Sequence, residues 1–327
     1  MQPLVSIVVP TFNRRDSLCT LLNALADQTY PASGFEVVVV DDGSTDGTLE
    51  RVQQLTLPYA LRIAQQAHGG PARARNLGVE QARGELILFL DDDVAPAPDL
   101  VAAHVAAQAG QDDLVVIGPM LPPDGWSRPA WIRWEEAKLV AQYEAMLAGK
   151  YACTPRQFFT ANASLRRERF LAAGGFDPSF KRAEDVELGY RLRDRGARFA
   201  FHGEARVVHY PTRTFVSWCR TPYQYGRYDV EMARKGHEAL RAAFREFHAR
   251  HRLTRWLTRW CVGRQWLVRT AVLALGGAAR LADTLGAHRP ASLAMSGIFS
   301  VLYWQGVADE LGSAARLWRS IARGARP

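Results

Sequence analysis

Runs of β-branched and other apolar residues alternate with segments of helical period through the first ninety residues, and this alternation limits the possible folds more than any other feature. The expected strands are 6–10, 35–40, 60–64 and 85–90, and the expected helices are 16–28, 45–55 and 71–82. Strands joined by helical connections form parallel sheets with helices on both faces. The sequence therefore predicts an α/β fold built on a mostly parallel, Rossmann-like sheet.

Short clusters follow three of these strands at the point where each strand ends. They are Pro10, Thr11, Phe12 and Asn13 after the first strand, Asp41 and Asp42 after the second, and Asp91, Asp92 and Asp93 after the fourth. In an open α/β sheet, ligands bind at the carboxyl ends of the strands. We therefore expect the three clusters to converge on one crevice.

The three consecutive aspartates end a strand that is apolar from Leu86 to Leu90. Adjacent carboxylates repel one another, and they stay ionised in a folded site only if a cation or hydrogen-bond donors compensate their charge. A divalent metal site is one interpretation. An acidic turn is the other, since Asp is common in turns. The convergence of the three clusters favours the metal site.

Further elements are expected up to residue 210. They are strands at 114–118 and 158–165, helices at 135–147, 167–173 and 183–192, and an irregular segment at 119–134 that contains Trp126, Trp131 and Trp134. These tryptophans either pack beneath a loop or form a wall against which a sugar could stack. Glu184 and Asp185 fall in the first turn of the last helix. The helix dipole favours carboxylates there, and an ordinary capping role remains open.

The charge of the chain changes sign at about residue 210. Residues 1–210 carry 22 Lys and Arg against 26 Asp and Glu, a net charge of −4, whereas residues 211–327 carry 19 against 7, a net charge of +12. Such an excess of one sign favours an anionic partner. Aromatic and basic residues also occur together in nucleic-acid binders. No recognisable nucleic-acid module accompanies them here, so we expect no nucleic-acid partner.

Apolar residues between 240 and 261 recur at helical spacing beside a basic stripe. The apolar residues are Leu240, Phe244, Phe247, Leu253, Trp256, Leu257, Trp260 and Cys261, and the stripe is Arg252, Arg255 and Arg259. This pattern is typical of a helix in a membrane interface, with arginines on anionic lipid. A helix packed on the N-terminal domain, with a solvated basic face, is the alternative. Residues 290–308 are uncharged but only moderately apolar, which favours an interfacial or re-entrant helix over a membrane span.

Cysteine spacing and the N-terminus bear on the compartment. Cys19, Cys153, Cys219 and Cys261 lie far apart without a CxxC pair, which argues against a zinc site or a disulfide framework. The first seven residues lack a basic segment and run directly into a strand, so we expect no secretory signal. The N-terminal part of the protein should therefore be cytosolic.

Five motifs in order resemble those of the family 2 nucleotide-sugar glycosyltransferases, which have a GT-A fold. They are VSIVVPTFNR at 5–14, VVVDDGSTDGT at 38–48, GGPARARNLG at 69–78, FLDDD at 89–93, and GGFD at 174–177 leading to Glu184 and Asp185. They extend over about the first 210 residues. Their number and order make the resemblance specific, whereas any one motif alone would be weak.

The resemblance implies a nucleotide-sugar site at the strand ends. It would include Pro10, Thr11, Phe12, Asn13, Asp41, Asp42, Arg75, Asp91, Asp92 and Asn162. Thr11 and Phe12 would hold the nucleoside together with Asp42, which would accept a hydrogen bond from the base. Arg75 would contact the nucleotide, although an arginine in a helix could equally be structural or solvated.

The resemblance also implies a divalent metal. Asp91 and Asp93 match the acidic positions of the family's DXD motif, so Asp93 would coordinate the metal and Asp91 would lie nearer the ribose. Asp92, the middle residue, would be the least constrained. His209 matches a position where some members place a further metal ligand, and a core or surface histidine is the alternative. Oxygen ligands suit Mn²⁺ or Mg²⁺, and an added imidazole would favour Mn²⁺.

Sugar transfer to a hydroxyl needs a base, because the pKa of a hydroxyl lies far above neutrality. Asp185 matches the family's catalytic base, and Glu184 would hold the acceptor or tune the pKa of Asp185. Asn162 would contact the acceptor or the donor sugar, with strand-end capping as the alternative. Direct displacement would invert the anomeric centre. The Gln-x-x-Arg-Trp motif of processive members does not occur in the sequence, which favours transfer of a single sugar.

The expected organisation is a GT-A catalytic domain over 1–210, with a nucleotide-binding half (1–118) and an acceptor-side half (119–210), followed by a basic helical region over 211–327. The expected activity is metal-dependent, inverting transfer of one sugar from a nucleoside-diphosphate sugar to a hydroxyl of a glycan or lipid-linked acceptor. We expect a cytoplasmic protein, peripheral on the anionic inner face of the cell membrane. A nucleotidyltransferase or a non-catalytic sugar-nucleotide-binding scaffold is the alternative.

Overall fold

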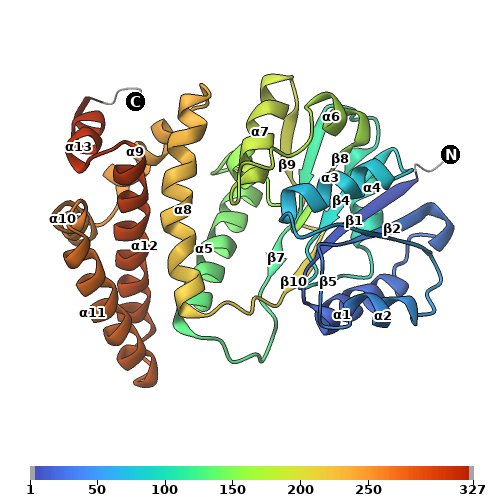
Figure 1. Ribbon diagram of the computed structural model, residues 1–327, viewed down its shortest axis with the longest axis horizontal. Helices are drawn as coiled ribbons and strands as arrows, with labels where there is room; N and C mark the ends of the chain where they lie inside the picture. Colours follow the sequence, from blue (N-terminus) through green and yellow to red (C-terminus); the bar gives the residue numbers. More distant parts are fainter. Residues whose placement is uncertain (1–3, 324–327) are drawn as a thin grey trace. The chain divides into compact units, whose positions relative to one another are not determined.

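The computed structural model describes residues 4–323, which divide into two compact units (Figure 1). Unit 1 consists of Met1–Trp126 and Lys138–Pro211, and unit 2 of Ser127–Ala137 and Thr212–Pro327. Helix α5 (Ala130–Leu147) is divided between the units after Ala137. Residues 1–3, on which part of the expectation of a cytosolic protein rests, and residues 324–327 lie outside the described range.

Unit 1 contains a seven-stranded sheet in the order β3-β2-β1-β4-β8-β6-β9. The strands are β1 (Val5–Thr11), β2 (Phe35–Asp41), β3 (Ala60–Gln65), β4 (Leu86–Leu90), β6 (Leu114–Ile117), β8 (Asn162–Arg166) and β9 (Arg198–Phe201). The neighbours β3, β2, β1 and β4 pair in parallel, as do β6 and β9, whereas β8 is antiparallel to both of its neighbours. The predicted mostly parallel α/β sheet is confirmed.

Alternate residues of the central strands enter two separate cores on opposite faces of the sheet. The helices of unit 1, besides its part of α5, are α1 (Arg15–Ala26), α2 (Thr48–Gln53), α3 (Pro71–Gln81), α4 (Leu100–Gln108), α6 (Arg167–Ala172), α7 (Glu184–Asp194) and the short η1 (Ala32–Gly34) and η2 (Pro155–Gln157). Ile7 and Val9 of β1 pack with α1, α2 and α4, and Val8 packs with α3, α6 and α7. Burial on both faces explains why these strands are continuously apolar.

A second, three-stranded sheet in unit 1 has the order β5-β10-β7. Its strands are β5 (Val94–Pro96), β10 (Val207–His209) and β7 (Met120–Leu121). β10 is antiparallel to β5, and their register pairs His209 with Val94. Because Val94 directly follows Asp93, this register brings His209 to the end of β4.

Unit 2 is helical, and α12 lies between α8 and the pair α10 and α11 (Figure 1). Its helices, besides the start of α5, are α8 (Phe215–Arg234), α9 (Ala239–Ala249), α10 (Arg252–Cys261), α11 (Gln265–Thr284), α12 (His288–Glu310) and α13 (Ala314–Arg323). Within residues 4–323, α12 is the one helix long and apolar enough to cross a membrane, and 72% of its apolar window is buried inside the protein. Packing against neighbouring helices accounts for the apolar content of this run, and the interfacial or re-entrant role expected for 290–308 stays a prediction.

The segment expected to be irregular at 119–134 contains the start of α5, which begins at Ala130. Trp131 packs on Phe215, with ring centroids 5.4 Å apart, and Trp134 meets Trp218 edge to face at 5.7 Å. Both tryptophans belong to the apolar core of unit 2. Of the two interpretations left open by the sequence, packing is the one that fits them.

Two glycines allow α8 and α12 to approach closely. A Cβ atom at Gly226 would lie 2.0 Å from the carbonyl oxygen of Tyr303, and one at Gly306 would lie 2.0 Å from that of Tyr223. We expect Gly226→Ala or Gly306→Ala to lower the free energy of unfolding by about 1–3 kcal/mol, because the helices must move apart. Denaturant unfolding followed by circular dichroism measures this change.

Gly277 in α11 provides the matched control, because a Cβ atom there would meet no described atom within 4 Å. Gly277→Ala should leave the stability unchanged or raise it by up to about 1 kcal/mol, since alanine favours the helix over glycine. If all three substitutions changed the stability equally, the close contact between α8 and α12 would not be the cause.

Candidate functional site

The carboxyl ends of β1, β2 and β4 lie side by side because the three strands are neighbours in the sheet. Thr11 pairs with Asp41 in the parallel register of β1 and β2, and Pro10 pairs with Val40. The Thr11 hydroxyl donates a 2.8 Å hydrogen bond to Asp92 Oδ2, just beyond the end of β4. The structure therefore brings the three clusters found in the sequence to one edge of the sheet.

The loop after β1 is tied to the loop after β2 through Asn13. This residue has a φ of 52°, a left-handed conformation that Asn tolerates because its short side chain can hydrogen-bond locally. Its backbone NH donates to Ser44 Oγ at 2.9 Å, and its Oδ1 accepts from the backbone NH of Thr45 at 2.7 Å. Asp41 Oδ1 accepts from the backbone NH of Ser44 at 3.1 Å. Asn13 and Asp41 thus fix the shape of both loops.

Asp42 holds the loop that precedes α3. Its carboxylate accepts hydrogen bonds from the backbone NH groups of Gly69 and Gly70 at 2.8 and 2.9 Å and from Gln66 Nε2 at 2.6 Å. Burial disfavours its charge, but these hydrogen bonds outweigh burial and hold the pKa of Asp42 below its usual value. Asp42 is therefore an ionised acceptor that already shapes the loop.

Phe12 and His68 form an exposed aromatic pair at the same edge. Their ring centroids are 4.2 Å apart, and the ring planes differ by 28°. Both rings are more than a third exposed. Such a planar, partly exposed surface suits the stacking of a flat ligand. His68 could not be predicted as a site residue, because nothing in its local sequence distinguishes it from an ordinary loop histidine.

The three aspartates have different surroundings. Asp92 is the most buried of them, and burial raises its pKa to about 7. Asp93 Oδ2 accepts a 2.7 Å hydrogen bond from Arg14 Nη1, and Asp92 Oδ1 lies 3.8 Å from Arg14 Nε. Asp92 was expected to be the least constrained of the three. The structure corrects this picture, because Asp92 is buried between the Thr11 hydroxyl and Arg14.

His209 reaches Asp93 from the small sheet. Its Nε2 lies 3.5 Å from Asp93 Oδ1, and the backbone NH of the next residue, Tyr210, donates to the carbonyl oxygen of Asp93 at 2.9 Å. Burial disfavours the charge of Asp93, but His209 and Arg14 outweigh burial and hold the pKa of this carboxyl below its usual value. The structure thus joins the two predicted metal ligands that are most distant in sequence.

The pair of Asp93 and His209 offers one oxygen and one nitrogen ligand to a divalent metal. Among residues 4–323, no three His, Cys, Asp or Glu side chains are grouped so that they could hold a metal ion. Magnesium sites commonly use one or two carboxylates and complete their coordination with substrate phosphates and water. The residues present therefore fit a hard divalent ion that binds together with a phosphate-containing ligand.

Arg75 is buried and joins two carboxylates that belong to different elements. From α3, its Nη2 donates to Asp91 Oδ1 at 2.7 Å, and its Nη1 donates to Glu184 Oε1 at 2.9 Å. Its guanidinium carbon lies 5.8 Å from the centroid of the Phe176 ring. The sequence left open whether Arg75 contacts a nucleotide or has a structural role. Its two ion pairs link the end of β4 to the start of α7, which is a structural role.

Glu184 and Asp185 open α7 at a constrained point of the backbone. The preceding residue, Ala183, has a φ of 58°, in the left-handed region that disfavours residues with a Cβ atom. Asp185 Oδ1 accepts a 2.8 Å hydrogen bond from the backbone NH of Val186. Burial, followed by the negative charge of Glu184, raises the pKa of Asp185 to about 7. A carboxylate with such a pKa is suited to proton transfer near neutral pH.

Asn162 lies inside the protein rather than in the crevice. Its side chain is fully buried, and its Nδ2 donates to the carbonyl oxygens of Ala205 at 2.7 Å and Pro119 at 3.2 Å. Its Oδ1 lies 3.0 Å from Nε2 of the buried His104. These contacts use the whole amide group within unit 1. They fit the structural role that the sequence left open and leave no group for a sugar.

Arg14 contacts two of the strand-end aspartates, and no role could be predicted for this arginine from the sequence. It lies within the first motif, at the end of the loop that follows β1. A single basic residue before a helix carries no pattern of its own. Its contacts with Asp92 and Asp93 become visible only once β1 and β4 are placed side by side.

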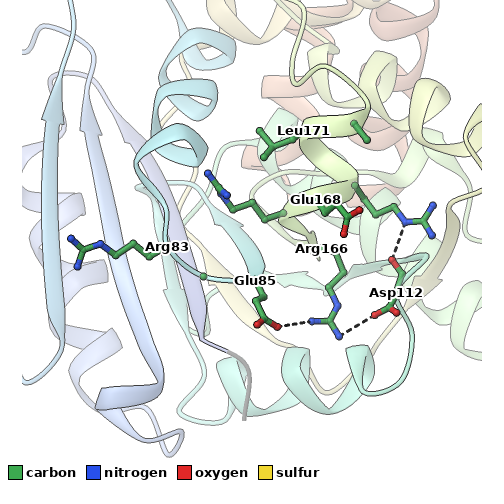
Figure 2. A pocket seen from close by; sticks show the side chains of 10 residues that line it. Arg83, Glu85, Asp112, Arg166, Glu168 and Leu171 are labelled. Carbon is green, nitrogen blue, oxygen red and sulfur yellow. Dashed lines mark hydrogen bonds and ion pairs between the residues drawn. The ribbon is translucent and has the colours of Figure 1, made fainter. Parts of the chain in front are cut away.

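A cavity of about 1110 Å³ lies at the opposite edge of the sheet (Figure 2). Its lining includes Arg83 and Glu85, which precede β4, and Arg166, which ends the antiparallel β8 and stands opposite Leu86. Arg166 forms ion pairs with Glu85 at 3.6 Å and Asp112 at 3.2 Å, drawn as dashed lines in Figure 2. None of the residues predicted from the sequence lines this cavity, so the edge where β4 ends remains the candidate site.

Solved structures identify the class of fold. The mannosyltransferase PcManGT from Pyrobaculum calidifontis, in complex with GDP-Man and Mn²⁺, is 23% identical and has a TM-score of 0.61, with 93% of this chain and 87% of that chain covered. TarS 1–349 of S. aureus in complex with UDP-GlcNAc is 21% identical and has a TM-score of 0.58, with 95% and 92% covered. These likenesses show the GT-A glycosyltransferase fold and confirm the predicted fold class.

The sequence profile of Glycosyl transferase family 2 matches residues 6–170, and the chain belongs to this family. Glycosyltransferase AglE of Haloferax volcanii is 28% identical over 247 residues, which are 74% of this chain and 78% of AglE. Validoxylamine A glucosyltransferase of Streptomyces hygroscopicus subsp. jinggangensis is 33% identical over 235 residues, 64% of this chain but only 56% of that relative. The protein is therefore a glycosyltransferase, as predicted, and the alternative of a nucleotidyltransferase is excluded.

Proposed function

We propose that this glycosyltransferase moves one sugar from a nucleoside-diphosphate sugar to a hydroxyl of a glycan or lipid-linked acceptor, with a divalent metal and with inversion of the anomeric centre. The observation that carries the proposal is the double ion pair of Arg75 with Asp91 and Glu184. This arrangement sets the carboxylates at the end of β4 beside those at the start of α7. A sugar bound over the first group would lie next to a base in the second.

The nucleoside site of the proposal is formed by Thr11, Phe12 and Asp42. The stacked rings of Phe12 and His68 offer a flat surface to a base. Asp42, which contacts His68 at 2.9 Å, would accept from a base NH group in place of one of the donors that it now binds. Pro10, Asn13 and Asp41 belong to the loops that surround this surface. UDP-GlcNAc bound to TarS and GDP-Man bound to PcManGT support a uridine or guanosine diphosphate donor. A thymidine diphosphate donor fits the same site chemistry.

The proposed metal ligands are Asp93 and His209, with Asp91 nearer the ribose. A bound divalent ion stabilises the negative charge that develops on the diphosphate leaving group. Arg14 donates to Asp93 Oδ2 at 2.7 Å, so Asp93 Oδ1, the oxygen nearer His209, is the one that would bind a cation. The Mn²⁺ bound to PcManGT supports the choice of Mn²⁺ or Mg²⁺.

Asp185 is the proposed base that takes the proton of the acceptor hydroxyl. Its raised pKa of about 7 matches this task at neutral pH. Glu184 orients the acceptor or Asp185, and Arg75 is a positioning residue that acts through Glu184. A single base and direct displacement at the anomeric carbon give inversion of configuration.

We place the reaction in the cytoplasm, at the inner face of the cell membrane. The net charge of +12 over residues 211–327 supports an anionic surface as the partner of this region. A glycan or lipid-linked acceptor fits that location.

Thermal unfolding with nucleotide sugars tests the proposal. We expect a UDP-, GDP- or dTDP-sugar to raise the Tm in the presence of Mn²⁺, because a ligand at 100 times its Kd stabilises the folded state by about 2.7 kcal/mol. Phe12→Ala should remove most of this shift. Leu171→Ala is the control, since Leu171 is an exposed apolar residue that lines the cavity at the opposite edge.

Product analysis by mass spectrometry, with glycan and lipid-linked acceptors, then separates transfer from binding. A sugar-acceptor product with inverted anomeric configuration supports the proposal. It would be overturned if no nucleotide sugar raised the Tm of the wild-type protein. Binding of the nucleotide sugar without any product would point instead to the non-catalytic scaffold.

A further inference from the structure

Two consecutive helices of unit 2 turn large apolar side chains outward. Trp256 and Trp260 on α10 are 60% and 56% exposed, and Trp266 on α11 is 67% exposed. Leu253, Leu273 and Leu281 are exposed to a similar degree, and these six residues are called the α10–α11 surface. Large exposed apolar side chains gathered on two helices that contact each other mark a candidate site of interaction.

Helix α11 has one side packed on the protein and an exposed side that carries both large apolar and basic residues. It packs on α12 and buries Val268, Gly276 and Ala279. Trp266, Leu273 and Leu281, spaced by seven or eight residues, share its opposite side. On the outer side these apolar residues alternate with Arg269, Thr270 and Arg280, which are also exposed. An exposed helix side that combines aromatic, aliphatic and basic residues is typical of a helix at a membrane interface.

The charged residues between 247 and 282 have one sign. Residues 247–282 contain seven arginines and no Asp or Glu. The guanidinium carbon of Arg264 lies 5.9 Å from the centroid of the Trp260 ring, and a cleft of about 230 Å³ is lined by Trp256, Arg259, Trp260 and Arg264. Tryptophan and arginine together fit the region where lipid headgroups meet acyl chains. The charge of the surface is thus complementary to anionic headgroups.

We propose that the α10–α11 surface seats in an anionic lipid bilayer, with the tryptophans at headgroup depth and the arginines on lipid phosphates. The inference rests on the proposed function for its location at the inner membrane face, and it assigns the residues that make the contact. α12, of which 72% of the apolar window is buried in unit 2, is not part of this contact.

A second copy of the chain fits this surface less well than a bilayer does. In a two-fold symmetric dimer the same surface would face itself. The exposed arginines beside the surface would then face those of the second copy, and residues 247–282 contain no carboxylate to compensate them. Like charges brought together across an interface cost free energy, whereas a bilayer of anionic lipid removes this cost.

Vesicle flotation with the full-length protein tests the proposal. We expect wild-type protein to float with vesicles of phosphatidylcholine and phosphatidylglycerol and to bind pure phosphatidylcholine vesicles at least about tenfold more weakly, because several arginines each contribute to binding at an anionic surface. Replacing Trp256, Trp260 and Trp266 together by alanine should weaken binding to the anionic vesicles by at least about tenfold. Tryptophan fluorescence of the wild type should be quenched by brominated lipid.

Val216→Ala is the matched control, since Val216 is 63% exposed on α8 of the same unit and lies outside the surface. This variant should bind vesicles like the wild type. An unchanged Tm of the triple variant establishes that it is folded, and a single variant, Trp256→Ala, tests the surface if the triple variant is unfolded. Equal flotation of wild type and either folded tryptophan variant would overturn the proposal. So would dimerisation in solution that the tryptophan substitutions abolish while vesicle binding is absent.

Sugar transfer to a soluble acceptor keeps this test separate from the proposed chemistry. The tryptophan variant should retain wild-type turnover of a soluble acceptor, because none of its substitutions lies among the residues of the candidate site. Vesicle binding by a protein without transferase activity would leave the docking surface intact and refute the chemistry. Full activity without vesicle binding would refute the docking surface and leave the proposed chemistry intact.

Discussion

Asp93→Ala is expected to lower kcat/KM for sugar transfer by about 10²–10³-fold, the loss typical when one charge-stabilising group is removed from an active site. The substitution removes the carboxylate proposed to bind the metal. It also leaves Arg14 and His209 without the carboxylate oxygens that lie 2.7 and 3.5 Å from them. Initial rates at several Mn²⁺ concentrations, compared with those of the wild type, measure the effect.

Metal binding gives a readout that does not depend on turnover. Calorimetric titration with Mn²⁺ in the presence of a nucleoside diphosphate should show binding at least about tenfold weaker in Asp93→Ala, since even the loss of an outer contact to a ligand costs about 10–100-fold. Asp112→Ala is the control, because the Asp112 side chain is 81% exposed at the opposite edge of the sheet. Wild-type-like turnover of Asp93→Ala, or full activity in EDTA, would refute the metal role.

Asp185→Asn is expected to lower kcat by about 10²–10⁴-fold, the usual contribution of a positioned base. Asparagine keeps the size of the side chain and an oxygen for the backbone NH of Val186, so α7 should begin as it does in the wild type. Binding of the nucleotide sugar, measured by the Tm shift, should remain. Asp194→Asn at the end of the same helix is the control and should leave both quantities unchanged. Normal turnover of Asp185→Asn would show that the base lies elsewhere.

The pH dependence of kcat/KM of the wild-type enzyme checks the same assignment without a substitution at Asp185. Burial and the charge of Glu184 raise the pKa of Asp185 to about 7, so Asp185 is protonated and unable to accept a proton below that pH. The value of kcat/KM should therefore fall as the pH drops through about 7. Glu184→Gln removes a neighbouring negative charge and should move this fall to lower pH. A wild-type profile that stays flat through neutrality would contradict the assignment.

The sheet and its three strand-end clusters could be predicted because burial on both faces leaves a continuous apolar run in the sequence. β1, β2 and β4 each show such a run, and Thr11, Asp41 and Asp91 lie at or directly after the strand ends. Once the strands are parallel neighbours, their carboxyl ends must meet. The order and direction of the strands alone therefore predict that the three clusters meet, without knowledge of any side-chain contact.

The partners of individual side chains could not be predicted in the same way. Arg75 has the same local sequence whether it faces a nucleotide, the solvent or the two carboxylates that it contacts. Asn162 at the start of β8 is equally ambiguous until its burial is known. Apolar content alone also did not predict which helix would be buried. The uncharged run of α12 lies in the core of unit 2, whereas α11 has large apolar residues on its exposed side.

The two ion pairs of Arg75 restrict how the substrate specificity of this enzyme can be redesigned. One guanidinium group holds Asp91 and Glu184, so a change that displaces α7 to admit a different acceptor also pulls on the end of β4. Small displacements of reacting groups are costly in catalysis. With the acceptor at α7 and the donor at the end of β4, as proposed, we expect the two preferences to change together, so engineering one of them alone is best attempted outside α7.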